Sequence, residues 1–182
     1  MSNLGKWSEW YKDLDSNTPS AFRYGDTETY PIAATFLQDC ELVEDWGCGA
    51  GGFKRYRTEG YRGIDGSQTP FADVIADLRT YRSDVDGILI RHVLEHDTGW
   101  RDILENAVAS CRKKLCLVLF TPFSEATQII AQNINHGIDV PDISFCKNDI
   151  ESFFIKCQFN LWTMETATGY GIEHMYRVIK HD

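Results

Sequence analysis

The chain has 182 residues, of which 43% are hydrophobic and 25% are charged, and its formal net charge is −9. This length fits one domain with a proper hydrophobic core. The acidic balance argues against nucleic-acid binding, because contacts with phosphates need clustered Lys and Arg. No apolar run approaches a membrane span, and the first residues lack a signal-peptide pattern, so we expect a cytoplasmic protein without membrane association. The six cysteines form no C-x-x-C pair, which predicts reduced structural thiols.

Residues 1–39 are rich in aromatic side chains and predict a short helix, a loop and a second helix that carries Ala33 and Leu37. The aromatic residues of this segment include Trp7, Trp10, Tyr11, Phe22, Tyr24 and Tyr30. The rings could form a lid over a binding site, or they could pack on the rest of the fold, and the sequence favours neither role. We therefore divide the chain into an aromatic cap segment, residues 1–39, and one main domain, residues 40–182.

From residue 40 onward, predicted strands alternate with predicted helices. The runs Gly87–Ile90 and Leu115–Phe120 are apolar throughout, as in parallel strands that are buried on both faces. The last two strands alternate apolar and polar residues, which favours an antiparallel pair. We expect strands at residues 40–46, 60–65, 73–77, 85–91, 114–121, 158–167 and 172–180, and helices at 52–58, 100–112, 124–134 and 148–157. This order predicts an α/β sandwich around a largely parallel sheet with a terminal hairpin.

Four glycines occupy six positions directly after the first predicted strand, which suits a sharp turn with a bare backbone surface where a ligand can lie. Gly47, Gly49 and Gly52 fit the dinucleotide pattern G-x-G-x-x-G. Gly47, Gly49 and Gly51 fit G-x-G-x-G with an acidic residue, Asp45, in front. Either pattern alone is a weak signal, so the flanking residues have to decide between them.

Three acidic residues favour one cofactor over the other. In a dinucleotide site, Asp45 would place its negative charge close to the negatively charged pyrophosphate, which is unfavourable. The same carboxylate suits a cationic ligand such as S-adenosylmethionine. Asp65 ends the next predicted strand, where an acid can accept hydrogen bonds from both ribose hydroxyls, although NAD proteins also do this. Asp77 ends a third strand, where it can meet the edge of an adenine. The pattern therefore favours S-adenosylmethionine, and an NAD-dependent oxidoreductase remains the alternative.

Successive motifs of this chain resemble those of the class I S-adenosylmethionine-dependent methyltransferases. They are Asp45-Trp46-Gly47-Cys48-Gly49-Ala50-Gly51, Gly63-Ile64-Asp65, Ala76-Asp77-Leu78 and His92-Val93-Leu94-Glu95-His96, followed by a segment, Phe145–Phe154, similar to the family's last helix. The resemblance implies a Rossmann-like three-layer sandwich with a seven-stranded, mostly parallel sheet whose last strand is antiparallel. It also implies methyl transfer from S-adenosylmethionine, with S-adenosylhomocysteine as product. The chain departs from the family in its short connections after Asp65 and Asp77.

The resemblance further implies which residues hold the cofactor. They are Asp45, Trp46, Gly47, Cys48, Gly49 and Gly51 for the methionine part, Asp65, Gly66 and Ser67 for the ribose and adenosine, Asp77 and Leu78 for the adenine, and Arg91 and His92 beside the sulfonium. Simpler roles stay open for some of them: Asp45 could only brace backbone amides, and Gly51 or Gly52 could serve packing alone.

Three histidines are candidate catalytic bases. Methyl transfer is an in-line displacement in which the protein chiefly aligns the reacting atoms, but a hydroxyl acceptor must also lose its proton. His92 and His96 follow the fourth predicted strand, near the expected methyl position. His136 follows the fifth strand, in a segment that in the family covers the acceptor, and it is the preferred candidate for acceptor chemistry.

The same histidines fit a second pattern. The segment from His92 to His96 reads H-x-x-E-H, an inverted zinc-protease signature, with Glu165 or Glu173 as a further ligand. Such a site needs a long helix, whereas this segment directly follows a buried strand. We therefore expect no metal ion.

The acceptor is expected to be a small molecule. The fourth strand lacks the Asp/Asn-Pro-Pro-Tyr signature of enzymes that act on nucleobase amines, and no basic domain is present for RNA. A hydroxyl or an amine of a sugar or another metabolite fits the short chain best. A non-catalytic module that only binds S-adenosylmethionine is a further alternative, and the oligomeric state, monomer or homodimer, stays open.

Overall fold

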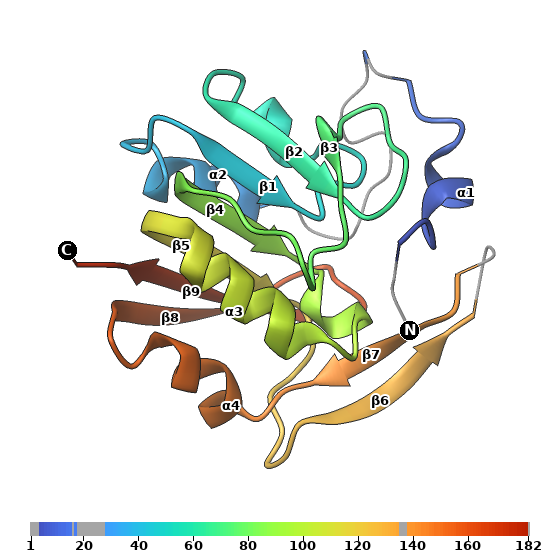
Figure 1. The fold of residues 1–182 in the computed structure, drawn as a ribbon. Coiled ribbons are helices and arrows are strands. Elements are labelled where there is room, and N and C mark those ends of the chain that lie inside the picture. Colours follow the sequence, from blue (N-terminus) through green and yellow to red (C-terminus); the bar gives the residue numbers. More distant parts are fainter. Residues whose placement is uncertain (1–3, 16, 18–27, 135–137, 182) are drawn as a thin grey trace.

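The computed structural model describes residues 4–15, 17, 28–134 and 138–181 (Figure 1). Within them, seven strands form one sheet in the order β3-β2-β1-β4-β5-β9-β8. Five strands are parallel, namely β1 (Val43–Trp46), β2 (Tyr61–Asp65), β3 (Val74–Ile75), β4 (Val85–Arg91) and β5 (Cys111–Leu119). The last strand, β9 (Ile172–Ile179), runs antiparallel between β5 and β8 (Gln158–Glu165). The fold class expected from the sequence is confirmed.

Helices cover both faces of this sheet and make the outer layers (Figure 1). Ile88 and Ile90 of β4 join the core cluster beneath α3 (Trp100–Ser110). Leu89 points the other way and joins the cluster that contains Ala33 of α2 (Thr29–Phe36). Side chains alternate along a strand, so an apolar run such as that of β4 can serve two cores at once. Each fully buried Leu or Ile contributes about 1.5–3 kcal/mol to this packing.

The order of the strands fixes where a ligand can bind. From β1 the chain moves outward through β2 and β3, and it then returns to the other side of β1 as β4. In open α/β sheets, such a reversal opens a crevice at the carboxyl ends of the strands on either side. The residues after β1, β2, β3 and β4 therefore meet at one edge, as their positions in the sequence suggested.

Two predicted helices are not helices in the structure. Residues 52–58 contain only a single 3-10 turn, Phe53–Arg55, because seven residues between Gly52 and Gly60 are too few for a stable helix. Residues 124–134 contain β6 (Gln128–Asn133), which pairs antiparallel with β7 (Val140–Ser144) in a separate two-stranded sheet. The β-branched Ile129 and Ile130 suit a strand, and their exposure shows that no helical face is buried here.

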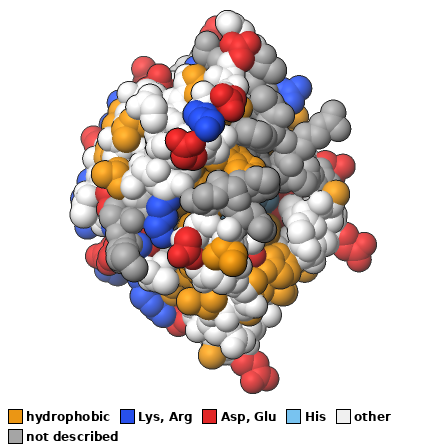
Figure 2. Space-filling view, turned by 90° about the vertical axis from the view of Figure 1, so that its right-hand side faces the viewer, with side chains coloured by type: hydrophobic (Ala, Val, Ile, Leu, Met, Phe, Trp, Pro, Cys, Tyr) orange, Lys and Arg blue, Asp and Glu red, His pale blue; other side chains and the backbone are white. Residues whose placement is uncertain are grey.

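The remaining helices are short. α1 (Ser8–Tyr11) and α4 (Lys147–Glu151) each span about one turn, and α4 continues as a 3-10 turn, Ser152–Phe154. The predicted helix at 148–157 is thus present but shorter. No helix in the described ranges has the length and apolar character needed to cross a bilayer. Figure 2 shows the face on which α1 and the β6–β7 hairpin lie, where hydrophobic side chains gather in a patch below the centre.

Candidate active site

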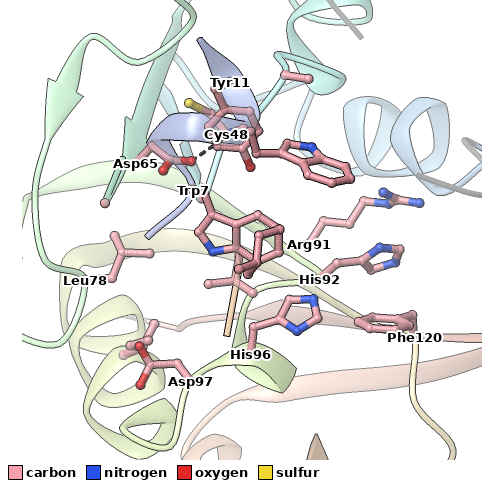
Figure 3. Close-up of a pocket in the computed structure, with 18 of the residues that line it drawn as sticks. Trp7, Tyr11, Cys48, Asp65, Leu78, Arg91, His92, His96, Asp97 and Phe120 are labelled. Carbon is pink, nitrogen blue, oxygen red and sulfur yellow. Dashed lines mark hydrogen bonds between the residues drawn. The ribbon is translucent and has the colours of Figure 1, made fainter. Parts of the chain in front are cut away.

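A cavity of about 480 Å³ lies at the carboxyl ends of the parallel strands. Small-molecule sites range from about 300 to 1,000 Å³, so the size suits a cofactor together with part of an acceptor. In Figure 3, Asp65, Cys48 and Leu78 lie on one side of the cavity, His92 and Phe120 on the other, and Trp7 between them. The predicted cofactor residues that line it are Gly47, Cys48, Gly49, Asp65, Gly66, Asp77, Leu78, Arg91 and His92.

The glycine-rich turn gives the cavity a wall of bare backbone. Gly47 and Gly49 have φ angles of 79° and 48°, which side chains of L-residues rarely allow. A Cβ atom on Gly47 would overlap the side chain of Val93, and one on Gly49 would lie 2.9 Å from the Tyr11 hydroxyl. The glycines are therefore required by the backbone angle and also by the closeness of the opposite wall.

Asp65 is a buried carboxylate at the end of β2. It accepts hydrogen bonds from the amides of Gly49 at 2.9 Å and Ser67 at 2.8 Å. Burial raises its pKa to about 6, although these amide hydrogen bonds oppose the shift. Each carboxylate oxygen has a second lone pair, so the group can accept further hydrogen bonds from a ligand.

Some predicted cofactor residues do not line the cavity. The Asp45 carboxylate is buried beside Tyr61, whose hydroxyl donates to it at 3.3 Å, and burial raises its pKa to about 7. Trp46 turns into the core on one face of β1 and donates its Nε1–H to Glu44 at 2.8 Å. Gly51 faces Phe71, and Ser67 receives a hydrogen bond from the Trp7 amide at 2.8 Å. Asp45 and Gly51 therefore serve the glycine-rich turn itself, and Trp46 serves the core. Ser67 holds the segment that contains Trp7.

The third strand brings Asp77 and Leu78 to the cavity, as predicted from their position after β3. Asp77 accepts a hydrogen bond from the amide of Arg79 at 3.0 Å, and the Leu78 carbonyl accepts one from Asn106 at 3.1 Å. The loop is therefore fixed by α3, and the leucine side chain offers an apolar surface to a ring.

Arg91 and His92 both bind one carboxylate, that of Glu173 on β9. Arg91 pairs with it at 2.9 Å, and Nε2 of His92 lies 2.5 Å from the same oxygen. Burial, followed by the charges of Arg91 and His96, lowers the pKa of His92 well below its usual range, so it is a neutral ring that donates its Nε2–H to Glu173. His92 is also the one non-glycine residue with a positive φ, 55°, among the residues that the structure describes.

His96 is held differently. Its Nδ1 lies 3.0 Å from the Pro141 carbonyl and 3.2 Å from a carboxylate oxygen of Asp142, both on β7. The ring packs against Trp7 and Phe120, with centroid distances of 5.5 Å and 5.4 Å. Burial opposes a charged ring, but the hydrogen bond to Asp142, the charge of Glu95 and the Pro141 carbonyl outweigh it and raise the pKa of His96.

The H-x-x-E-H segment is not arranged around one point. His92 binds Glu173, His96 binds Asp142, and the buried Glu95 accepts a hydrogen bond from the amide of Phe120 at 2.6 Å. No group of three or more His, Cys, Asp or Glu side chains within the described ranges is placed to hold a metal ion.

Several cavity residues were not predicted, and one prediction is not described. Phe120, Asn133 and Ile138 line the cavity. Phe120 could have been found, because it directly follows β5 at the same edge of the sheet. Asn133 ends β6 and Ile138 precedes β7, in a hairpin that the sequence did not reveal. His136, the preferred acceptor base, lies outside the described residues.

The first residues of the chain complete the cavity. Leu4, Trp7, Trp10 and Tyr11 line it. This segment is tied to the loop after Asp65 by two backbone donors: Gly5 donates to the Gly66 carbonyl at 2.7 Å, and Trp7 to the Ser67 side chain. Trp7 and Tyr11 stack with 6.4 Å between centroids. Aromatic residues of α1 thus line the cavity, while α2 packs on the sheet.

Solved structures share this architecture. Magnesium protoporphyrin IX methyltransferase from Synechocystis PCC 6803, solved with bound S-adenosylmethionine, aligns with a TM-score of 0.63 at 15% identity over 85% of this chain and 79% of that chain. The 1,6-didemethyltoxoflavin-N1-methyltransferase of Burkholderia thailandensis, with bound 1,6-didemethyltoxoflavin and S-adenosylhomocysteine, gives 0.64 at 15% identity over 86% and 78%. DesVI of Streptomyces venezuelae gives 0.57 at 10% identity over 94% of each chain.

The likeness defines the fold: the chain has the fold of the class I S-adenosylmethionine-dependent methyltransferases. No protein-family model matches the chain, and no curated protein is similar to it in sequence.

Proposed function

We propose that this protein is an S-adenosylmethionine-dependent methyltransferase that acts on a hydroxyl or an amine of a small molecule. The observation that carries the proposal is the bare turn at Gly47 and Gly49 beside the buried Asp65, within one cavity that extends to His96. The proposal includes residues 1–39 as a cap on the site, a cytoplasmic location and a monomer or homodimer.

The described residues fit this cofactor. Asp65 has hydrogen-bonding capacity for ribose hydroxyls, and Leu78 offers an apolar face beside Asp77 for an adenine. The turn offers main-chain groups to an amino-acid tail. When bound, the cofactor supplies a methyl carbon activated by a positively charged sulfur. The carboxylate of Asp65, which lines the cavity, favours such a cation over a diphosphate.

The protein's own contribution is alignment and exclusion of water. The cap residues Trp7 and Tyr11 cover the cavity, and the fixed rings of His92 and Phe120 border it opposite Leu78. Holding two reactants in line converts a bimolecular step into one within a single complex, and this alone gives a large acceleration. The neighbours named above act on a porphyrin and on a toxoflavin precursor, which supports a small-molecule acceptor here.

Calorimetry tests the cofactor. S-adenosylhomocysteine should bind the protein with a stoichiometry of one, and NADH should not bind. Asp65→Asn should weaken S-adenosylhomocysteine binding by about 10- to 100-fold, because hydrogen bonds to a charged group contribute about 1.5–3 kcal/mol. Thermal unfolding of the same variant checks that it is folded. NADH binding without S-adenosylhomocysteine binding would instead establish the oxidoreductase, and cofactor binding without transfer to any acceptor would indicate a non-catalytic module.

A further inference from the structure

The two cavity histidines differ in the atom that carries the proton. The neighbours of His96 Nδ1 are a backbone carbonyl at 3.0 Å and a carboxylate at 3.2 Å, and both of these groups only accept hydrogen bonds. Nδ1 of His96 must therefore carry a hydrogen. In the neutral ring the lone pair then lies on Nε2, which is the atom that can take a proton. His92 has the opposite arrangement, because its Nε2 donates to Glu173.

Asp142 is itself fixed by donors from β6 and from the loop before β9. Asn133 of β6 donates to one of its oxygens at 2.6 Å, and Tyr170, from the loop before β9, donates to the other at 2.8 Å. Burial would raise the pKa of Asp142, but His96 and these donors hold it below its usual range. The carboxylate is therefore ionised at neutral pH and orients the imidazole, as carboxylates do beside catalytic histidines.

Beside its polar partners on β7, His96 lies among aromatic rings. Trp7 and Phe120 contact its ring, and Tyr170 extends the aromatic wall at 5.8 Å from Phe120. Among the described residues that line the cavity, Arg91 is the one Lys or Arg, and Glu173 neutralises it. Arg91 is therefore already engaged and does not serve as the counter-charge of an anionic acceptor, whereas an uncharged aromatic ring finds faces on which it can stack.

We propose that the acceptor is an uncharged aromatic hydroxyl and that His96, positioned by Asp142, removes its proton. This inference rests on the proposed function and names its substrate class. The acceptor O–H bond breaks and its proton goes to Nε2 of His96. The oxygen forms a bond to the methyl carbon, the carbon–sulfur bond breaks with its electron pair left on sulfur, and the proton then passes from His96 to solvent.

The choice of an aromatic hydroxyl follows from acidity as well as shape. A phenol loses its proton at about pH 10, as tyrosine does. An alkyl alcohol is closer to water, whose pKa is about 16. A histidine therefore removes a phenolic proton with far less difficulty. A neutral amine needs no base before attack, so it would not use the pair of His96 and Asp142.

Nitrogen-15 NMR of histidine-labelled protein, without any cofactor, tests the base. The His96 signals are identified by their absence in His96→Gln. Groups that face this ring are Asp142 on β7, Glu95 beside it and His92 at the end of β4. We expect the Nδ1–H form, and a pKa that falls by about one unit in Asp142→Asn while it is unchanged in Asp139→Asn, a control on the same hairpin. An Nε2–H form, or equal values in both variants, would overturn the assignment.

A matched set of ligands tests the acceptor class. The set is 2-naphthol, 2-naphthylamine and decahydro-2-naphthol, which share a two-ring frame and differ in the acceptor atom or in planarity. With S-adenosylhomocysteine present, we expect 2-naphthol to bind at least about tenfold tighter than the other two. His96→Gln should remove that preference, and Asp139→Asn should keep it. Preference for the amine or the saturated alcohol, or no binding of any of the three, would overturn the proposal.

The two proposals fail in different ways. If S-adenosylhomocysteine does not bind, the methyltransferase assignment itself is wrong. If it binds and the NMR or the ligand preference contradicts the expectation, only the acceptor class and the role of His96 are wrong.

Discussion

Asp45 provides a direct test of the electrostatics at the glycine-rich turn. Its carboxyl is buried, and burial raises its pKa from 3.8 to about 7, against the hydrogen bond from Tyr61. The folded pKa is higher than the unfolded one, so between about pH 4 and pH 7 the unfolded chain releases a proton that the folded chain keeps. Stability from this group is therefore lost as the pH rises through that window. A difference of about three pKa units corresponds to roughly 4 kcal/mol.

Asp45→Asn removes this titration while keeping an oxygen that can accept from Tyr61. We expect the variant to be similar in stability to the parent protein near pH 4.5 and more stable above pH 7, by up to roughly 4 kcal/mol. Urea unfolding of the cofactor-free protein, followed by tryptophan fluorescence from pH 4.5 to 8, measures the difference. Asp102→Asn, at an exposed position on α3, serves as the control. Parallel stability curves for Asp45→Asn and the parent would refute the reasoning.

Two further variants test the walls of the cavity. Gly47→Ala should lower the free energy of unfolding by about 2–4 kcal/mol, because its φ becomes strained and its Cβ overlaps Val93, and it should abolish S-adenosylhomocysteine binding. Adding Val93→Ala should recover only the part of the stability loss that is due to the overlap. Thermal unfolding measures both effects. Trp7→Ala should weaken 2-naphthol binding by about 2- to 10-fold in calorimetry, because one aromatic contact contributes about 0.5–1.5 kcal/mol, and unchanged affinity would show that Trp7 is no part of the site.

Most of the central sheet could be predicted because its signals are local. The apolar runs of β4 and β5 are short and buried on both faces, as in central parallel strands. The β6–β7 hairpin could not be predicted in the same way. Ile129, Ile130 and Ile134 have spacings that a helix would also produce, and the pairing that makes a strand lies about ten residues further on, in β7.

The residues of the candidate site likewise divide into those that a local sequence signal predicts and those that it does not. Gly47, Asp65 and Asp77 could be found because each ends or follows a strand of the parallel sheet, and parallel strands bring their carboxyl ends to one edge. Asp142 had no such signal, since it lies on the hairpin that was missed. Trp46 was assigned to the cofactor from the motif, but side chains alternate along β1 and this one is directed into the core.

The attachment of the first residues has an evolutionary consequence. The contacts of Gly5 and Trp7 with Gly66 and Ser67 join the first residues to the loop after β2 rather than to the strands of the central sheet. Substitutions there can alter which acceptors enter while β1, β4 and β5 keep their packing. Chimeras that exchange only the first fifteen residues between proteins of this fold should therefore redirect ligand selectivity and still assemble the same central sheet.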